Sequence, residues 1–310
     1  MTAVTNRPFG RVLTAMVTPF AEDASLDLDG AVRLATHLVD DDRHDGLVLS
    51  GTTGESPTTS DAEKESLLRA VLEAVGDRAK VVAGVGTSDT AHSIHLAEQA
   101  AKAGAHGLLV VTPYYSKPPQ AALLAHFRSV ADATDLPVML YDIPGRTGTA
   151  IDTETLVRAG EHEQIVAVKD AKGDLFAGSE VMARSDLAYY SGDDPLNLSW
   201  LAHGAAGVVS VVGHAFGTAY AEMIDAVDDG NLSRAREIHV GLIPAVQAIM
   251  SRESQGAIRA KAVAQLLGLI DFRRVRGPLL DASDDEVALV REVLVRSGVL
   301  RAVPGGPVAE

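Results

Sequence analysis

Short runs of apolar, often β-branched residues recur along the chain and alternate with longer stretches of helical spacing. Each run is uncharged over most of its length, which is typical of a strand that is buried on both faces. The segment IVAVK, for example, is apolar until it ends at Lys169. Eight strands are predicted on this pattern, at residues 13–18, 46–50, 80–85, 107–112, 137–141, 165–169, 188–191 and 207–211.

The segments between these strands carry the periodicity of amphipathic helices. After Ser60, apolar residues recur every four positions from Leu67 to Val75, and Glu63 lies three residues beyond Ser60, as in a capping box. Similar patterns cover residues 90–103 and 120–133, and Asp152 is expected to cap the next helix. Eight strand–helix alternations with nearly continuous apolar strands predict a (β/α)₈ TIM barrel, of class α/β, rather than an open sheet.

Beyond about Thr218 the strand pattern stops and only helical patterns follow. Four helices are predicted there, at residues 219–228, 233–250, 256–267 and 284–297. The predicted organisation is therefore a catalytic barrel over residues 1–217 and a C-terminal helical appendix over 218–300. The last segment, 301–310, is rich in proline and glycine and is expected to be disordered.

Composition narrows the class of protein. The chain has 310 residues, of which 46% are hydrophobic, enough for one large core. It has no cysteine, no apolar stretch long enough for a membrane span, and no signal-peptide pattern at its start, so a cytoplasmic location is expected. A net charge of −15 argues against nucleic acid as a partner, because such binding depends on neutralising phosphates.

Candidate chemistry gathers where the predicted strands end, and in a barrel of this kind those ends form the active-site face. The loops that follow the strands carry SGTTGES from Ser50, TPYYSKPP with Tyr114 and Tyr115, YDIPGRTG with Tyr141 and Arg146, Lys169 itself, and SGDD from Ser191. Hydroxyl groups, an amine and a guanidinium are thus expected at one mouth.

Lys169 has two interpretations. A lysine at a strand end is most often a surface residue, but a lysine held against apolar walls has a lowered pKa and can attack a carbonyl carbon. The other loops expected at the same barrel face carry hydroxyl groups and an arginine, and their presence favours the interpretation of Lys169 as a catalytic amine. Arg146 is bracketed by Pro144 and Gly148 and is suited to bind a carboxylate with two hydrogen bonds. The ten histidines show no metal-binding spacing, so no metal site is expected.

Together these motifs resemble the dihydrodipicolinate synthase (4-hydroxy-tetrahydrodipicolinate synthase) family of pyruvate-dependent Schiff-base aldolases and lyases. The resemblance extends from about Gly10 to Leu300 and rests on GTTGES, VTPYY, YDIPGRTG, VKDAKGD and SGDD, which occur in that order. It implies condensation of pyruvate with L-aspartate 4-semialdehyde in the diaminopimelate and lysine biosynthesis pathway. It also implies that no cofactor is used, because the substrate forms the Schiff base directly with the enzyme.

The resemblance assigns four catalytic positions. Lys169 matches the lysine that condenses with pyruvate, and Tyr141 matches the tyrosine that moves protons to and from the intermediate. Thr52 and Tyr115 match the other members of the proton relay, and Tyr115 is expected to reach into the site of a neighbouring subunit. A homo-oligomer, a dimer of dimers in the family's usual form, follows from this expectation.

The resemblance also assigns four binding positions. Thr53 matches a contact to the pyruvate carboxylate, and Val209 a main-chain contact where many relatives have isoleucine. Gly192 matches a position whose backbone lines the pocket. Arg146 matches the arginine that binds the carboxylate of aspartate semialdehyde.

Many relatives are inhibited by L-lysine, which binds between two subunits beside the GTTGES loop. Inhibited relatives commonly have a histidine or similar residue, an asparagine and a glutamate there, and the glutamate holds the ammonium of the ligand. This sequence has Lys64, Ser88 and His92 at the matching positions, with Pro57 at the end of the loop, and it retains Tyr114. We therefore expect no inhibition by L-lysine.

Two other interpretations have to be distinguished. Another pyruvate aldolase, such as N-acetylneuraminate lyase or a keto-deoxy sugar-acid aldolase, would share the lysine, the tyrosine and the glycine–threonine loop; Arg146 favours the synthase. A catalytically silent ligand-binding relative would lack at least one catalytic position, and none is missing here.

Overall fold

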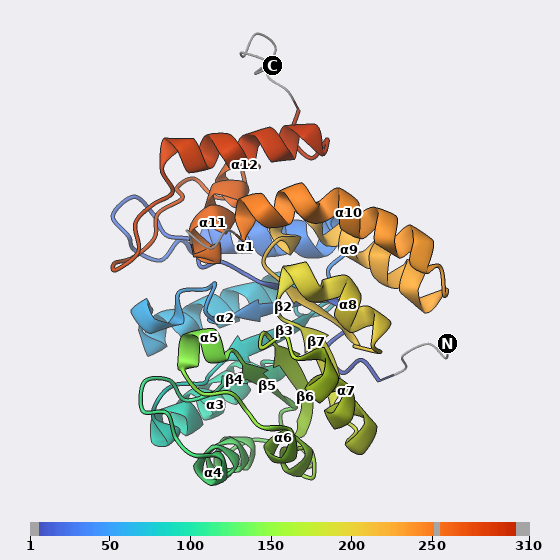
Figure 1. Ribbon diagram of the computed structural model, residues 1–310. Helices are drawn as coiled ribbons and strands as arrows, with labels where there is room; N and C mark the ends of the chain where they lie inside the picture. The colour runs from blue at the N-terminus through green and yellow to red at the C-terminus, as the bar shows by residue number, and fades with distance from the viewer. Residues whose placement is uncertain (1–5, 251–254, 302–310) are drawn as a thin grey trace.

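The computed structural model describes residues 6–250 and 255–301 of the chain. Within these residues, eight parallel strands pair in sequence order and β8 pairs with β1, which closes a barrel (Figure 1). The predicted TIM barrel is therefore confirmed. The strands are β1 (Val12–Ala15), β2 (Gly46–Leu49), β3 (Lys80–Gly84), β4 (Gly107–Val111), β5 (Val138–Asp142), β6 (Ile165–Asp170), β7 (Ala188–Ser191) and β8 (Gly207–Ser210).

The strands divide the core into two layers, because successive side chains point to opposite faces. One cluster fills the inside of the barrel and includes Leu13, Met139, Tyr141 and Val209. The other lies between the strands and the surrounding helices. Apolar contacts on both faces explain why the strands read as continuous apolar runs in the sequence.

Helices surround the barrel and connect its strands. They are α1 (Leu28–Thr36), α2 (Asp61–Val75), α3 (Thr90–Ala103), α4 (Gln120–Ala131), α5 (Pro144–Thr147), α6 (Thr153–Ala159), α7 (Leu175–Arg184), α8 (Asn197–Ala202) and α9 (Gly213–Asp228), with short turns η1 (His37–Asp41), η2 (Ser56–Thr58) and η3 (Asp194–Leu196). The capping box of Ser60 and Glu63 begins α2 as predicted. Asp152 lies at the N-cap of α6, but its side chain makes no capping hydrogen bond.

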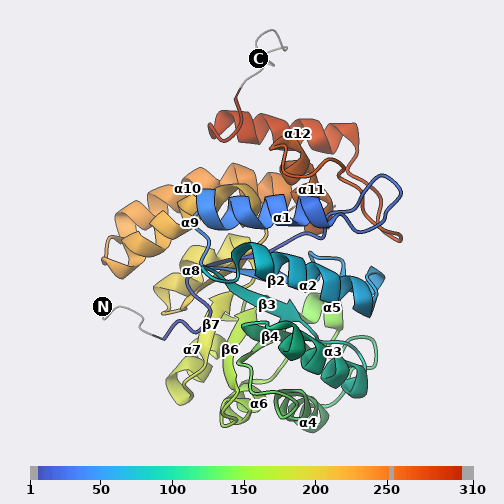
Figure 2. The same cartoon turned by 180° about the vertical axis from the view of Figure 1, so that it is seen from behind.

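Three further helices form the C-terminal part of the described chain, namely α10 (Leu232–Ile249), α11 (Gly256–Leu266) and α12 (Asp284–Arg296). They lie together on one side of the barrel, with α12 farthest from the strands (Figures 1 and 2). Their bounds agree with the predicted helices to within one residue at each end. None of the described helices is long and apolar enough to cross a membrane.

α9 begins six residues earlier than the sequence pattern predicted, at Gly213 instead of residue 219. Two glycines and a kink at Phe216 hide the helical pattern in its first turns. The kink is held by Asp42, whose carboxylate accepts hydrogen bonds from the backbone N–H groups of Gly217 and Thr218, at 2.7 and 2.8 Å. The division proposed at residue 217 lies within α9, and all but the first residue of the expected tail lies outside the described residues.

Candidate active site

Lys169 is a buried amine near the C-terminal end of β6. Only 4% of the residue is exposed, and its Nζ lies 4.2 Å from the centre of the Tyr141 ring. Tyr141 and Lys169 are register partners on β5 and β6, and so their side chains meet on the same face. Burial lowers the pKa of Lys169 to about 8, and the nearby positive charge of Arg146 acts in the same direction. The amine is therefore partly neutral near neutral pH, as a nucleophile requires.

Asp194 supplies the main opposing charge, since it favours the protonated form of Lys169. Its buried carboxylate accepts hydrogen bonds from the N–H groups of Val211 and Val212, at 2.9 and 3.1 Å, and from the side chains of Asn197 and Ser210. The carboxylate is thus fixed by the segment that follows β8. It keeps the lowering of the Lys169 pKa moderate.

Tyr141 is a buried phenol whose pKa is raised to about 12 by burial. The charge of Arg146 and a hydrogen bond with Thr52 act against this rise. The phenol therefore stays protonated at neutral pH and can pass a proton along a hydrogen-bonded chain. Thr52 belongs to the loop after β2, so β2 and β5 together build this pair.

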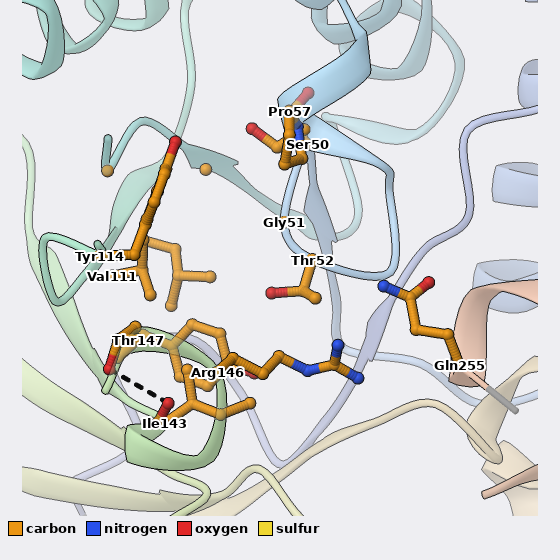
Figure 3. Close-up of a pocket in the computed structure, with 15 residues that line it drawn as sticks. Ser50, Gly51, Thr52, Pro57, Val111, Tyr114, Ile143, Arg146, Thr147 and Gln255 are labelled. Carbon is orange, nitrogen blue, oxygen red and sulfur yellow. Dashed lines mark hydrogen bonds between the residues drawn. The ribbon is translucent and has the colours of Figure 1, made fainter. Parts of the chain in front are cut away.

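A cavity of about 250 Å³ opens beside the pair and continues into a second cavity of about 200 Å³ that reaches Lys169. The two share Thr52, Tyr141, Ile143, Arg146 and Gln255 as lining residues. Figure 3 shows the side chain of Arg146 extending across the pocket towards Gln255, with Thr52 above it. The structure therefore brings Thr52, Tyr141, Arg146 and Lys169 to one continuous space.

Arg146 lies on the single turn α5, between Pro144 at its start and Gly148 at its end. Gly148 has φ +77°, a conformation that glycine adopts without strain, and its N–H bonds the carbonyl of Pro144 at 2.9 Å. The turn aims a guanidinium at the cavity while leaving the residue exposed. Among the described residues, no acidic side chain forms an ion pair with Arg146, so an anionic ligand can use it.

Gly192 and Thr53 line the part of the pocket that contains Lys169. A Cβ atom on Gly192 would lie 2.8 Å from Cγ of Lys169 and 2.9 Å from its Cε. Only a glycine leaves room for the extended lysine side chain. Thr53 is buried in the loop after β2, next to Thr52.

Two predicted site residues lie away from this pocket in the single chain. Tyr115 is 95% exposed, with φ +73°, whereas its neighbour Tyr114 lines the cavity. Val209 is buried inside the barrel, in the same apolar cluster as Tyr141, and is not among the residues that line the two cavities. The chain alone therefore does not bring Tyr115 to Lys169.

Sequence reasoning did not single out three residues that the structure places at or beside the site. Gln255 lines both cavities, and its side-chain oxygen is buried without a hydrogen-bond partner. Asp193 lines the cavity next to Lys169, and burial raises the pKa of its carboxyl. Asp194 does not line either cavity, but its negative charge raises the pKa of Lys169. The motif SGDD indicated the two aspartates as a pair, but no local pattern indicated Gln255.

The described residues contain no group of three or more histidine, cysteine, aspartate or glutamate side chains placed to hold a metal ion. What the pocket offers is a partly neutral amine, a protonated phenol with a threonine hydroxyl, and a guanidinium. This combination suits the formation of a Schiff base with a small keto acid and binding of a second anionic substrate.

Comparison with known proteins agrees with this chemistry. Residues 8–296 match the model of the dihydrodipicolinate synthetase family. The 4-hydroxy-tetrahydrodipicolinate synthase of Kineococcus radiotolerans is 62% identical over 96% of both chains. The enzyme of the same name from Acidothermus cellulolyticus is 63% identical over 98% of this chain and 97% of its own. A crystal structure of the Cyanidioschyzon merolae synthase with lysine bound is 39% identical, covers 95% of this chain and all of its own, and superposes with a TM-score of 0.91.

Proposed function

Because the chain belongs to the dihydrodipicolinate synthetase family and has 4-hydroxy-tetrahydrodipicolinate synthase activity, we propose that Lys169 forms a Schiff base with pyruvate and that the resulting enamine attacks L-aspartate 4-semialdehyde. One observation carries this assignment: a buried lysine amine lies 4.2 Å from the ring of a buried tyrosine, and both residues line the same cavity. The product belongs to the pathway to diaminopimelate and lysine.

The first step is addition of the Lys169 amine to the ketone of pyruvate, followed by loss of water to give an iminium. With a pKa of about 8, roughly a tenth of Lys169 is neutral at pH 7, compared with less than a thousandth for an ordinary lysine. Thr53 and backbone N–H groups of its loop are proposed to hold the pyruvate carboxylate. Gly192 leaves the space that the adduct needs, and Val209 contributes a main-chain contact.

The second step removes a proton from the methyl group of the bound pyruvate, and the iminium takes up the electron pair to give an enamine. Tyr141 and Thr52 are proposed to carry this proton along their hydrogen bond. Tyr115 of a partner subunit completes the relay, which is consistent with its almost complete exposure in the single chain. No cofactor enters these steps, because the iminium itself is the electron sink.

The third step joins the enamine carbon to the aldehyde of the second substrate. Arg146 is proposed to bind the carboxylate of aspartate semialdehyde, since its guanidinium spans the cavity without an acidic partner among the described residues. The amine of the new product then attacks the iminium and displaces Lys169. Cyclisation therefore regenerates the free enzyme.

The decisive experiment treats the protein with pyruvate and borohydride and locates the adduct by peptide mass spectrometry. One reduced pyruvyl group is expected on a peptide containing Lys169, and the Lys169→Ala variant should keep its fold and gain none. An adduct on another lysine, or none in the parent protein, contradicts the assignment. A panel of aldehydes then tests the second substrate, because a sugar-acid lyase would prefer hydroxylated aldehydes to aspartate semialdehyde.

The proposed assembly is at least a homodimer, with a dimer of dimers as the expected form. A cytoplasmic location remains a prediction from the sequence.

A further inference from the structure

A buried ion pair ties the loop that contains Thr52 to the C-terminal helices. Glu55 belongs to this loop and is 3% exposed. One oxygen of its carboxylate accepts a hydrogen bond from the amine of Lys261 on α11, and the other accepts one from the N–H of Arg276 at 2.8 Å. The two members of the ion pair are 206 residues apart in sequence. The loop that contains Thr52 is thus held by residues of the C-terminal part of the chain.

Lys261 is completely buried, and its amine makes two described contacts besides the ion pair with Glu55. Its amine also donates to the carbonyl of Arg274 at 2.6 Å and lies 4.0 Å from the centre of the Phe20 ring. Bringing two charges into the interior carries a large desolvation penalty, and an apolar pair of similar volume is often as stable. Stability alone therefore gives a weak reason for a buried ion pair, whereas fixed geometry gives a stronger one.

Backbone hydrogen bonds connect the position of Glu55 to that of Thr52. Glu55 has φ +55°, in the left-handed region that is uncommon for residues other than glycine. Its N–H bonds the carbonyl of Thr52 at 3.2 Å, and the next N–H, of Ser56, bonds the carbonyl of Gly51 at 3.2 Å. These two bonds close the turn on which Thr52 lies. Without Lys261, the carboxylate of Glu55 keeps only the N–H of Arg276 among these two partners, and the downstream end of the turn is held less firmly.

Arg276 provides a second tie to the same segment. Its guanidinium bonds both oxygens of Glu63, at 2.6 and 2.9 Å, and the carbonyl of Thr58 at 2.8 Å. It also lies over the ring of Phe20, 4.2 Å from the centre. Arg276 thus holds the start of α2, while Lys261 reaches the loop that carries the Thr52 hydroxyl.

We propose that Lys261 is a positioning residue for the reaction: through Glu55 it holds the Thr52 hydroxyl at the hydrogen-bonding position beside Tyr141. This inference rests on the proposed function, because it concerns the proton transfer that Thr52 and Tyr141 carry out. It gives the C-terminal helices a part in the chemistry. Among the described residues of this part of the chain, only Met250 and residues 255–257 line the pocket. Misplacement of a catalytic group by about 1 Å can lower a rate a hundredfold.

The test measures how fast the methyl protons of pyruvate exchange with D₂O on the enzyme, which reports proton transfer without the second substrate. Lys261→Met keeps the volume and removes the charge, and it should slow exchange by about tenfold to hundredfold while borohydride still traps pyruvate on Lys169. Arg259→Met is the matched control. Arg259 is also a buried cation on α11, but it pairs with Glu286 and the carbonyl of Ala248. This control should exchange within about twofold of the parent protein.

A double-mutant cycle separates positioning from general stability. In the Thr52→Val background the relay hydroxyl is already absent, so adding Lys261→Met should change the exchange rate less than twofold. If the two substitutions slow exchange by independent factors that multiply in the double variant, Lys261 does not act through Thr52 and the inference is overturned. Exchange at the parent rate in Lys261→Met, with only a lower melting temperature, would overturn it as well.

If Lys261→Met does not fold, Glu55→Gln takes its place in the same cycle with the same expected outcomes. It keeps a carbonyl oxygen for the N–H of Arg276 and removes the charge that faces Lys261. Failure of the proposed function looks different: the parent protein itself would show no exchange and no adduct on Lys169, and the inference would fall with it. Normal exchange in the parent and in the Lys261 variant rejects only the inference.

Discussion

At the residue scale, the pocket contains two positive groups that do different work because their surroundings differ. Lys169 is buried, and the loss of water around its amine lowers its pKa to about 8. Arg146 is exposed on a short turn, and its planar guanidinium can donate two parallel hydrogen bonds to a carboxylate. The lysine can therefore become a neutral nucleophile, while the arginine is suited only to bind an anion.

This difference predicts separate effects on the two half-reactions. Arg146→Ala should lower kcat/KM for aspartate semialdehyde about a hundredfold, because a charge-assisted contact to a carboxylate is lost at a cost of about 3 kcal/mol. Trapping of pyruvate on Lys169 should change little. Steady-state kinetics with each substrate and borohydride trapping measure the two effects. An equal loss in both half-reactions would assign Arg146 to the scaffold instead.

At the element scale, the junction between β8 and α9 depends on two buried histidines. His214 accepts the N–H of Val17 at Nε2, 3.1 Å away, and its Nδ1 lies 2.7 Å from the carbonyl of Val211. His44 lies 2.7 Å from the Thr14 hydroxyl at Nε2 and 2.8 Å from the carbonyl of Leu38 at Nδ1. The His214 ring must accept at Nε2 and donate at Nδ1, so it is held in its neutral form.

Stability should therefore fall in mild acid. Burial lowers the pKa of His214 to about 4, below the value near 6.5 of an unfolded chain. Between about pH 4 and pH 6.5 the histidine is protonated in the unfolded chain but not in the folded one. The stability that the neutral His214 provides is therefore complete above about pH 6.5 and is lost as the pH falls towards 4. It amounts to at most about 3 kcal/mol. Burial also lowers the pKa of His44, which adds to the loss in acid.

Urea unfolding of the parent protein and of His214→Gln at pH 7.5 and pH 5 measures this effect. The variant should be less stable at pH 7.5, yet it should lose less stability on acidification than the parent protein. His95→Gln, which removes an exposed histidine of α3, is the control and should behave like the parent. If His214→Gln and the parent lose the same free energy between the two pH values, His214 is not the group responsible.

At the scale of the whole molecule, the proton relay that we propose for Thr52, Tyr141 and Tyr115 is not complete within the single chain. Tyr115 points away from its own pocket, and Tyr114 beside it lines the cavity, where Figure 3 places it opposite Thr52. An exposed fraction of 95% is unusual for an aromatic residue as large as tyrosine. Both observations fit a subunit interface in which Tyr115 enters the neighbouring site.

Subunit mixing tests this arrangement. Tyr115→Phe and Lys169→Ala should each be inactive alone, because one lacks the relay hydroxyl and the other the nucleophile. In a mixed dimer, one site combines an intact Lys169 with an intact Tyr115 from the partner, so activity should return in part. Native mass spectrometry must show that mixed dimers form. Mixed dimers without any activity would place Tyr115 outside the catalytic relay.

The second prediction at this scale concerns L-lysine, which we expect not to inhibit at millimolar concentration. The resemblance places His92 where inhibited relatives have a glutamate. His92 lies 2.9 Å from Asp61, whose carboxylate also faces Lys64 at 4.0 Å. The carboxylate of Asp61 is thus already paired, and Lys64 would repel a ligand ammonium. Loss of this attraction should weaken binding by several kcal/mol, roughly a thousandfold.

An activity assay with rising L-lysine checks this expectation. Half-inhibition should need more than about 1 mM, which corresponds to a binding free energy weaker than about 4 kcal/mol. His92→Glu is the informative variant, because it restores a carboxylate and should make the enzyme more sensitive than the parent. Half-inhibition of the parent below 1 mM would contradict the prediction.

The sequence by itself determined the barrel and the main residues expected in its pocket. Strand and helix periods are local properties, so the C-terminal ends of the eight strands were located to within three residues, with the largest difference at β1. In a parallel barrel, strand ends meet on one face, and the placement of Lys169, Tyr141 and Arg146 at one pocket followed from that rule and from the family motifs.

Only the tertiary structure decided properties that depend on distant parts of the chain. The pKa of Lys169 is set by burial and by Asp194, and the first turns of α9 are held by Asp42. The bond from Lys261 to Glu55 joins residues that no local pattern connects, and the exposure of Tyr115 depends on the whole surface. Burial and long-range charge arise only when segments pack together, and for that reason no sequence period records them.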